Sequence, residues 1–284
     1  MTEVWNTDWL SSYFFSGLSS VKGRVLQYRD WPSLDDLNGW PMGQPIRFVE
    51  QDYSPKAFEA QYEPRIYLKK EVQTRLKNWH DFFNALIWFL FPKIKQTLNQ
   101  RQYEALLVRQ SAGETPGKST RTPAENMMTH FDECGMIVFS DQRELLEALK
   151  THQWKSLFWD NREFTNRHME FVLFGHATYE MGLKPFIGMT TKALLLEVPT
   201  SCLNSARTRQ HEQIDMAVSL LLANLLEQGV VPCLQPIPLL GIPGWSALGE
   251  QASFYDDVEY FRPQKNVGQL NFSDKIFRVK DVLR

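Results

Sequence analysis

The chain has 284 residues, a length that suits one large domain or two small ones. Hydrophobic residues make up 43% and charged residues 23% of the sequence, and this balance excludes collagen-like, low-complexity and wholly disordered proteins. The chain has 31 Lys and Arg residues and 33 Asp and Glu residues, which gives a formal net charge of -2. It therefore lacks the positive charge of a dedicated nucleic-acid binder, and we expect no nucleic-acid partner.

No segment has the pattern of a signal peptide or a membrane span. Residues 1–13 include Glu3 and Asp8 but no basic region and no long apolar run. The most apolar stretch, residues 82–91, is about ten residues long, whereas a membrane-spanning helix needs about 20. The three cysteines are far apart and form no C-x-x-C pair, which is typical of a reducing compartment. We therefore expect a cytoplasmic protein with no membrane partner; its oligomeric state is not predicted.

The first predicted segment, residues 1–68, is an irregular arm rich in aromatic residues. Turn signals such as Asn38-Gly39 and Trp40-Pro41 divide it into short stretches. Since each large apolar side chain that is buried contributes around 1.5 to 3 kcal/mol, we expect the arm to pack on the core. Its tryptophans are Trp5, Trp9, Trp31 and Trp40.

Helical periodicity begins at residue 69. Apolar residues then recur at alternating steps of four and three, which is typical of one helix face turned toward a core. Pro92 ends or kinks this helix, and a second amphipathic helix is predicted over residues 94–108. The apolar positions of the first helix are Val72, Leu76, Trp79, Phe83, Leu86 and Leu90.

Residues 111–121 contain no apolar side chain larger than alanine, and they predict a mobile surface loop. Gly117-Lys118-Ser119 matches the end of a phosphate-binding loop. However, Ala112 stands where that motif has its first glycine, and the preceding segment is predicted to be a helix rather than the required strand. We therefore predict that this loop does not bind nucleotide.

A capping box with proline at the first helical position, Thr122-Pro123-Ala124-Glu125, predicts the start of a short helix. The end of this helix is open to two interpretations. Residues 127–139 could instead form a hairpin that turns at residues 132–135, because Gly135 precedes a Met-Ile-Val-Phe strand pattern.

The rest of the chain alternates between helices and short apolar strands. Two helices are predicted within residues 142–167, another opens at residues 176–181, and an apolar helix over residues 214–226 is closed by Gly229. Four prolines between residues 232 and 243 predict an extended strap across the surface. The predicted fold class is α+β: a mainly helical single domain with a small mixed β-sheet built from residues 136–139, 170–174 and 193–198.

Ionisable residues lie beside strongly apolar sequence in three separated segments. His80, Asp81 and Asn84 share one flank of the first helix, and Asp132 and Glu133 fall at the predicted turn. The third segment places His176 and Glu180 four residues apart on a helix. Because burying such groups singly would cost several kcal/mol apiece, we expect the three segments to meet in one pocket.

These residue types suit two different roles. Histidines spaced four residues from Asn84 or Glu180 could hold a ligand or a metal, and paired carboxylates could act as a general base or as metal ligands. The alternative is purely structural: His80 and Asp81 hydrogen-bond to nearby backbone, His176 caps its helix, and Asp132 and Glu133 form an ordinary turn. The sequence leaves both interpretations open.

Five blocks occur in order over roughly residues 65–263: Trp79-His80-Asp81-Phe82-Phe83-Asn84-Ala85-Leu86, Phe131-Asp132-Glu133 with Gly135, Phe174-Gly175-His176-Ala177 with Glu180, Gly241-Ile242-Pro243-Gly244-Trp245, and Phe261-Arg262-Pro263. Together they resemble the signature blocks of a proteobacterial family named domain of unknown function 3025. The family name carries no activity. The resemblance implies that seven polar residues belong to the shared pattern, namely His80, Asp81, Asn84, Asp132, Glu133, His176 and Glu180.

We therefore expect a family-like core at residues 69–263 and a C-terminal tail at residues 264–284. The first function hypothesis is a hydrolase-like enzyme acting on a small-molecule ligand. Its catalytic residues would be His80, Asp81, Asp132, Glu133, His176 and Glu180, with Asn84 and Trp245 also lining the pocket. Imidazole and carboxylate ligands suit zinc, iron or manganese, and the candidate ligands of such a divalent metal are His80, His176 and Glu180. The second hypothesis is a non-catalytic binding or protein-interaction module whose polar blocks are structural.

Overall fold

The computed structural model describes residues 3–41, 45–54, 57–113, 121–264 and 276–279. The fold is α+β and mainly helical, as the sequence predicts. The strands are β1 (Arg47–Glu50), β2 (Glu71–Thr74), β3 (Gly135–Ser140), β4 (Met169–Leu173), β5 (Thr190–Glu197), β6 (Gln235–Pro238) and β7 (Phe277–Arg278). The helices are α1 (Ser19–Val25), α2 (Leu34–Asn38), α3 (Tyr62–Lys69), α4 (Trp79–Leu90), α5 (Pro92–Ser111), α6 (Pro123–Cys134), α7 (Arg143–Lys150), α8 (Arg162–His168), α9 (His176–Gly182), α10 (Thr200–Leu203) and α11 (Arg207–Glu227).

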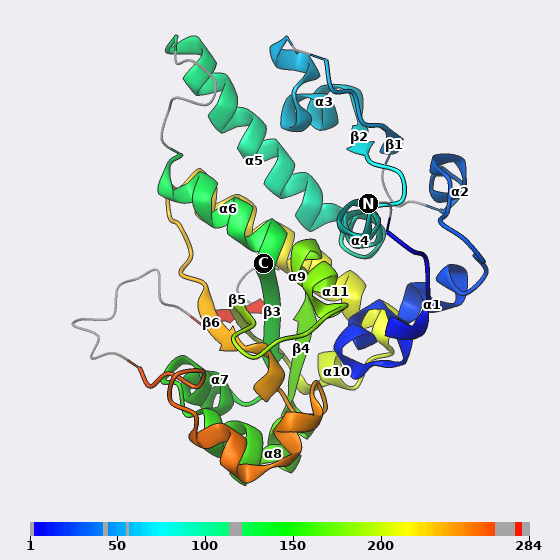
Figure 1. The fold of residues 1–284 in the computed structure, drawn as a ribbon. Helices are drawn as coiled ribbons and strands as arrows, with labels where there is room; N and C mark the ends of the chain where they lie inside the picture. Colours follow the sequence, from blue (N-terminus) through cyan, green and yellow to red (C-terminus); the bar gives the residue numbers. More distant parts are fainter. Residues whose placement is uncertain (1–2, 42–44, 55–56, 114–120, 265–275, 280–284) are drawn as a thin grey trace.

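A five-stranded mixed sheet lies among the helices, with the strand order β4-β3-β5-β6 and with β7 paired to β5 (Figure 1). β3 is antiparallel to β4 and parallel to β5, where Gly135 lies opposite Lys192. β6 runs antiparallel to the first residues of β5, and β7 runs parallel to its last residues. The predicted small mixed sheet is therefore confirmed, and β6 and β7 extend it.

The central strand β3 is the best-covered element of the sheet. All six of its residues are buried, because β4 and β5 cover its two edges while α6 and α7 contact it. A continuous apolar run such as Met136-Ile137-Val138-Phe139 is what a strand buried on both faces requires. The apolar run of α4 is equally buried, with Phe83, Leu86 and Ile87 fully enclosed.

None of the described helices combines the length and the apolar character needed to cross a bilayer.

Helix α4 begins at Trp79 rather than at residue 69. Its N-cap is Asn78, whose side chain accepts a hydrogen bond from the backbone N–H of Asp81, and Lys77 before it adopts a positive φ of 53°. Val72 belongs instead to β2, and Leu76 is 52% exposed in the connecting turn. The helix prediction for residues 69–78 is wrong because two apolar residues at helical spacing also fit a strand followed by a turn.

Helix α6 begins at the predicted capping box. The Thr122 side chain accepts a hydrogen bond from the Glu125 N–H, and the Glu125 carboxylate accepts one from the Thr122 N–H. The helix then runs without interruption to Cys134, and β3 follows at once. The hairpin interpretation is therefore wrong, and Asp132 and Glu133 lie in the last helical turn, where buried Met127, Met128 and Phe131 hold the helix on the core.

The near-motif for phosphate binding lies mostly outside the described residues, which exclude 114–120. Helix α5 does extend to Ser111, so the segment before Ala112, where the motif would begin, is helical and not a strand. The mobile loop and its failure to bind nucleotide stay predictions.

The first 69 residues hold more regular structure than the sequence predicts. They contain α1, α2, α3 and β1, and β1 pairs in parallel with β2. Elements of four to eight residues carry too little periodicity to be recognised from sequence, and the β1–β2 pairing joins residues about 24 positions apart. The division of the chain at residues 68 and 263 stays a prediction.

Aromatic residues of the N-terminal segment pack on α4 and α9. Trp5 stacks on Trp79 with ring centroids 5.3 Å apart, and Phe15 stacks on Tyr179 at 5.8 Å. The Glu3 carboxylate accepts a hydrogen bond of 2.6 Å from the Trp79 N–H. This N–H belongs to the first turn of α4, where backbone donors lack helical partners and a negative charge is favoured.

The proline-rich segment after α11 is only partly extended. Residues 235–238 form β6 at the edge of the sheet, a position that tolerates proline. Beyond it come the 3₁₀ helices Leu239–Gly241, Ala247–Glu250 and Ala252–Asp256. The prediction of a continuous extended strap is wrong because proline excludes the interior of an α-helix but not short 3₁₀ turns.

Acid is expected to destabilise the fold through His211 on α11. This imidazole is 3% exposed, its ring nitrogens have no hydrogen-bond partner among the described residues, and burial, with a smaller effect of Arg207, lowers its pKa to about 4. Below the unfolded-state pKa of about 6.5, the unfolded chain binds a proton that the folded protein does not, so stability falls as the pH drops from 6.5 to 4.

Urea unfolding at pH 7 and pH 4.5 measures this effect. We expect the His211→Leu variant to lose about 2 kcal/mol less stability than the parent between these two pH values. The matched control is His130→Leu, because His130 is exposed. Equal losses in the parent and the His211 variant would contradict the prediction.

Candidate functional site

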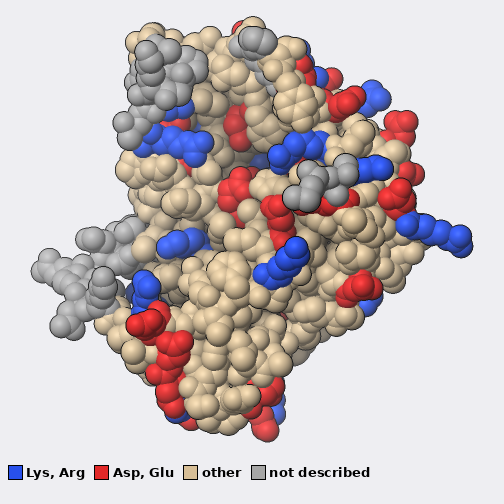
Figure 2. Space-filling model, in the orientation of Figure 1, with Lys and Arg blue, Asp and Glu red and all other residues tan. Residues whose placement is uncertain are grey.

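A polar cavity of about 570 Å³ is lined by α5 and α6 together with the segments around β1, β2 and α3. Figure 2 shows a hollow in this region, with basic and acidic side chains gathered around it. Helix α4 contributes His80, Asp81 and Asn84, and α9 contributes His176. The cavity is of the size that small-molecule sites commonly have.

The three segments that carry the predicted ionisable residues meet at this cavity. His80 Nε2 lies 3.0 Å from His176 Nε2. Glu133 Oε2 lies 3.8 Å from the first of these nitrogens and 3.4 Å from the second. Glu180 Oε2 lies 3.0 Å from His80 Nδ1. The structure therefore brings together five of the predicted residues from α4, α6 and α9, since Asp132 also lies 3.9 Å from His176, while their catalytic role stays a prediction.

Two glycines allow these helices to approach so closely. Gly135 follows α6 and Gly175 precedes α9, and the Gly135 carbonyl accepts hydrogen bonds from the N–H groups of Phe174 and Gly175. A Cβ atom on Gly175 would lie 2.5 Å from the Glu133 carbonyl oxygen and from the Gly135 nitrogen. The absence of a side chain at residue 175 thus lets His176, the first residue of α9, start beside Glu133 at the end of α6.

The three converging atoms have the separations of a metal site. In a tetrahedral zinc site with bonds of about 2.0–2.1 Å, neighbouring ligand atoms lie roughly 3.3–3.4 Å apart. The three separations here, 3.0, 3.4 and 3.8 Å, bracket that value. His80, Glu133 and His176 form the group of described residues whose ligand atoms could hold one ion. Burial lowers the pKa of His176 to about 3, so this ring is neutral at pH 7 and has a lone pair to offer.

A carboxylate supports the His80 ring from the other side, because Glu180 hydrogen-bonds to His80 Nδ1. A carboxylate in this position fixes the tautomer and orientation of a histidine ligand. Asp132 Oδ2 lies 3.9 Å from His176 Nδ1, which is beyond hydrogen-bond distance. Burial raises the pKa of Asp132, but Lys95 and His176 outweigh it and leave the pKa below its usual value, so the carboxylate is charged. Lys95 donates a 2.6 Å hydrogen bond to it.

Asp81 and Asn84 have other partners. The Asp81 carboxylate accepts hydrogen bonds from Nε, Nη2 and the backbone N–H of Arg75, so it stabilises the turn before α4 rather than contacting the histidines. Asn84 donates from Nδ2 to the Tyr62 hydroxyl at 3.0 Å. Its Oδ1 is buried without a hydrogen-bond partner among the described residues, which leaves an acceptor beside the cavity.

The structure corrects the placement of Trp245. This side chain packs on Phe14 with ring centroids 5.0 Å apart, and it lines a separate cavity together with Tyr13 and Arg162. Its sequence block, Gly-Ile-Pro-Gly-Trp, lies far along the chain from the three polar segments, and nothing in the sequence tied it to them.

Residues that contact the carboxylates of the site were not identified from the sequence. Lys95 and Asn99 are buried on α5, and Asn99 Nδ2 donates a 2.6 Å hydrogen bond to Glu63, which lines the cavity. Burial raises the pKa of Glu63 to about 7. A signal was present, because Lys95 and Asn99 are four residues apart and adjoin the apolar pair Ile94 and Leu98, which marks a buried polar flank.

Among the comparisons with known proteins, only the one with protein families finds a match. The searches of curated proteins and of solved structures find none. A family model described as "Protein of unknown function (DUF3025)" matches residues 46–265. This range contains every lining residue of the cavity and all of its convergent His, Asp and Glu residues. The five sequence blocks lie within it too, and because the match covers most of the chain, the chain belongs to the family described as Protein of unknown function (DUF3025).

Proposed function

We propose that this protein is a metal-dependent hydrolase of a small polar molecule, with a divalent ion held by His80, Glu133 and His176. The observation that carries the proposal is the triangle formed by two Nε2 atoms and one carboxylate oxygen at tetrahedral ligand spacing. Glu180, predicted as a ligand, takes a supporting position instead, since it binds the far nitrogen of His80.

The chemistry of the three donors favours catalysis over a structural role. Structural zinc sites are closed by four protein ligands, whereas catalytic ones have three and leave a position for water. Such a bound water has a pKa near 7 and can attack a carbonyl or phosphoryl group at neutral pH. Among the described residues, His80, Glu133 and His176 line the polar cavity, so a substrate can reach an ion bound between them.

A second candidate is a non-catalytic binding module. The 3.0 Å contact between the two Nε2 atoms and the His80–Glu180 hydrogen bond also fit a network that satisfies itself without an ion. The two candidates differ in whether the protein binds a metal in defined stoichiometry, and this difference can be measured.

Calorimetric titration of chelator-treated protein with Zn²⁺ tests the proposal. We expect one ion per chain and a loss of at least about 100-fold in affinity for His80→Ala, Glu133→Gln and His176→Ala, because each removes a ligand. For Glu180→Gln we expect a smaller loss of about 10- to 100-fold, since such supporting carboxylates contribute that much.

The matched control is His168→Ala. His168 also pairs with a carboxylate, Asp141 at 2.9 Å, but it does not line the cavity. Absence of stoichiometric zinc binding, or equal binding by the parent and the His80→Ala/His176→Ala double variant, would favour the non-catalytic network.

Hydrolysis is then tested with a panel of p-nitrophenyl esters and phosphates. The expected activity requires added metal and is abolished by a chelator; zinc binding without hydrolysis of any substrate in the panel would contradict the hydrolase assignment.

A further inference from the structure

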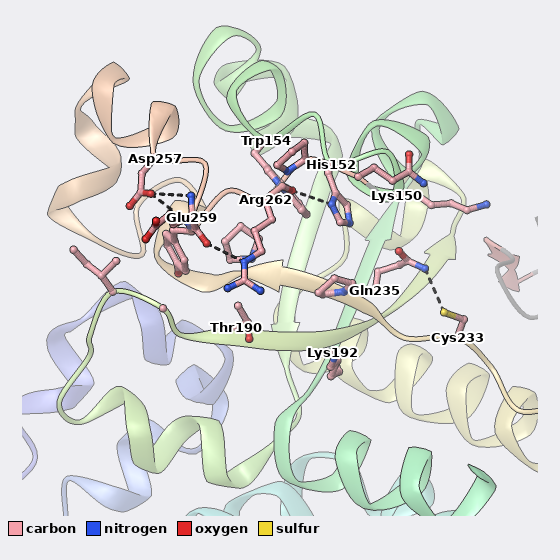
Figure 3. A pocket seen from close by; sticks show the side chains of 17 residues that line it. Lys150, His152, Trp154, Thr190, Lys192, Cys233, Gln235, Asp257, Glu259 and Arg262 are labelled. Carbon is pink, nitrogen blue, oxygen red and sulfur yellow. Dashed lines mark hydrogen bonds between the residues drawn. The ribbon is translucent and has the colours of Figure 1, made fainter. Parts of the chain in front are cut away.

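A second cavity, of about 840 Å³, is formed by residues that do not line the first one. It is bounded by β5, by β6, by the end of α7 and by residues 257–264. Figure 3 shows Thr190, Lys192 and Gln235 on the strands, with Lys150 and His152 on one side and Asp257 and Glu259 on the other. No residue of the candidate metal site takes part in it.

Two of the basic residues that line this cavity lack acidic partners among the described residues. Among the described residues, neither Lys192 nor Arg262 has a carboxylate within ion-pair distance, and the Arg262 guanidinium donates only to the Glu259 carbonyl. Lys150, whose side chain is 13% exposed, forms an ion pair of 4.0 Å with Glu147. Other cations pair more closely with carboxylates, as in Lys95–Asp132 and Arg207–Glu170.

Lys192 is the most unusual of these cations, because it lies within a strand of the sheet. In the sheet register it stands between Gly135 of β3 and Pro236 of β6. Lys192 is half-buried as a residue and has no counter-charge among the described residues, so a bound anion would gain an ion pair there.

The remaining walls are apolar. Ile187, Pro236 and Pro238 line the cavity along the strands, and Trp154 and Tyr260 line it opposite. Trp154 is held in place by a hydrogen bond from its Nε1 to the Arg262 carbonyl. His152, which adopts a positive φ of 58°, stacks on it with ring centroids 4.8 Å apart and binds the same carbonyl. The backbone strain at His152 thus places two aromatic rings beside the basic residues.

We propose that this cavity binds an amphipathic organic anion whose carboxylate or phosphate group pairs with Lys192 and Arg262 and whose apolar part contacts Ile187, Pro238 and Trp154. This binding is independent of the metal site.

Calorimetric titration with decanoate, decyl phosphate and decan-1-ol tests the proposal, because the three probes share an apolar chain and differ in the head group. We expect at least one of the two anions to bind at least tenfold more tightly than the alcohol. Tighter binding of decanoate identifies the carboxylate as the natural group, and tighter binding of decyl phosphate identifies the phosphate. Anions that bind no better than decan-1-ol would overturn the proposal.

Two variants locate the site. Lys192→Met keeps the length of the side chain and removes its charge. We expect this variant to bind the anions at least tenfold more weakly than the parent and to bind decan-1-ol with unchanged affinity. Arg262→Gln should also weaken anion binding. Lys184→Met, at an exposed lysine that does not line the cavity, is the matched control. His176→Ala should bind the anions as the parent does. Unchanged anion binding by both the Lys192 and the Arg262 variant would overturn the proposal, and circular dichroism of each variant confirms that it is folded.

Discussion

Replacement of Lys95 by methionine is expected to lower the free energy of unfolding by about 3–5 kcal/mol. The Lys95 side chain is 5% exposed, and its ammonium donates a 2.6 Å hydrogen bond to Asp132. Methionine fills a similar volume but leaves the Asp132 carboxylate charged, largely buried and without its closest partner. Breaking a buried ion pair from one side is costly for this reason, even where the intact pair contributes little net stability.

Urea unfolding of three variants measures the coupling between the two residues. Lys95→Met and Asp132→Asn should each destabilise the protein, and the double variant should lose less than the sum of the two, since neither charge then remains without its partner. The control is Lys155→Met, because Lys155 contacts Asp256 at the same distance of 2.6 Å but both side chains are largely exposed. Exposed pairs contribute about 1 kcal/mol or less. A loss in Lys95→Met no larger than in Lys155→Met would contradict the prediction.

The Gly175→Ala variant is expected to lose about 3 kcal/mol of stability or more. The added methyl group would lie 2.5 Å from three backbone atoms: Cys134 Cα, the Glu133 carbonyl oxygen and the Gly135 nitrogen. Overpacking of a core commonly costs about 1–3 kcal/mol, and here the neighbours are main-chain atoms that cannot rotate away, so the cost lies at or above the upper end. The same displacement would separate His176 from Glu133, so zinc affinity should fall together with stability.

The matched control is Gly23→Ala in α1. No described atom lies within 4 Å of the added methyl group there, and alanine favours a helix over glycine by about 0.5–1 kcal/mol. Thermal and urea unfolding should therefore show opposite signs for the two substitutions. If Gly175→Ala proved as stable as the parent and bound zinc equally well, the close packing of α6 against α9 would not be what positions the site.

The candidate site was predictable in part because its residues interrupt apolar sequence. His80 and Glu180 lie on helices whose other faces are buried, and His176 directly follows a buried strand, so burial of these polar side chains implied mutual contact. Lys95 and Arg75 were missed because a basic residue in an amphipathic or turn segment is usually solvated, and only the tertiary fold brings a carboxylate to each.

Those helices and strands were predictable whose position is determined by their own local sequence. The α6 start follows from a local capping box, and β3, β4 and β5 follow from continuous apolar runs. The start of α4 was not predictable, because Val72 is buried in a strand that pairs with β1. The sequence pattern within residues 69–90 contains no sign of that pairing. Trp245 was misplaced for the same reason, since its neighbour Phe14 lies more than 200 residues earlier.

The packing of the N-terminal aromatic residues on α4 and α9 has a consequence for synthesis on the ribosome. Trp5, Trp9 and Phe15 are made early, but their partners Trp79, Phe83 and Tyr179 follow much later. At about 5–20 residues per second, Trp5 and Trp9 are without these partners for roughly four to fifteen seconds, and Phe15 is without Tyr179 for roughly eight to thirty seconds. During that interval the segment is a natural target for chaperones that bind aromatic sequence, and the helix bearing His80 cannot acquire its Glu3 cap by folding of the first residues alone.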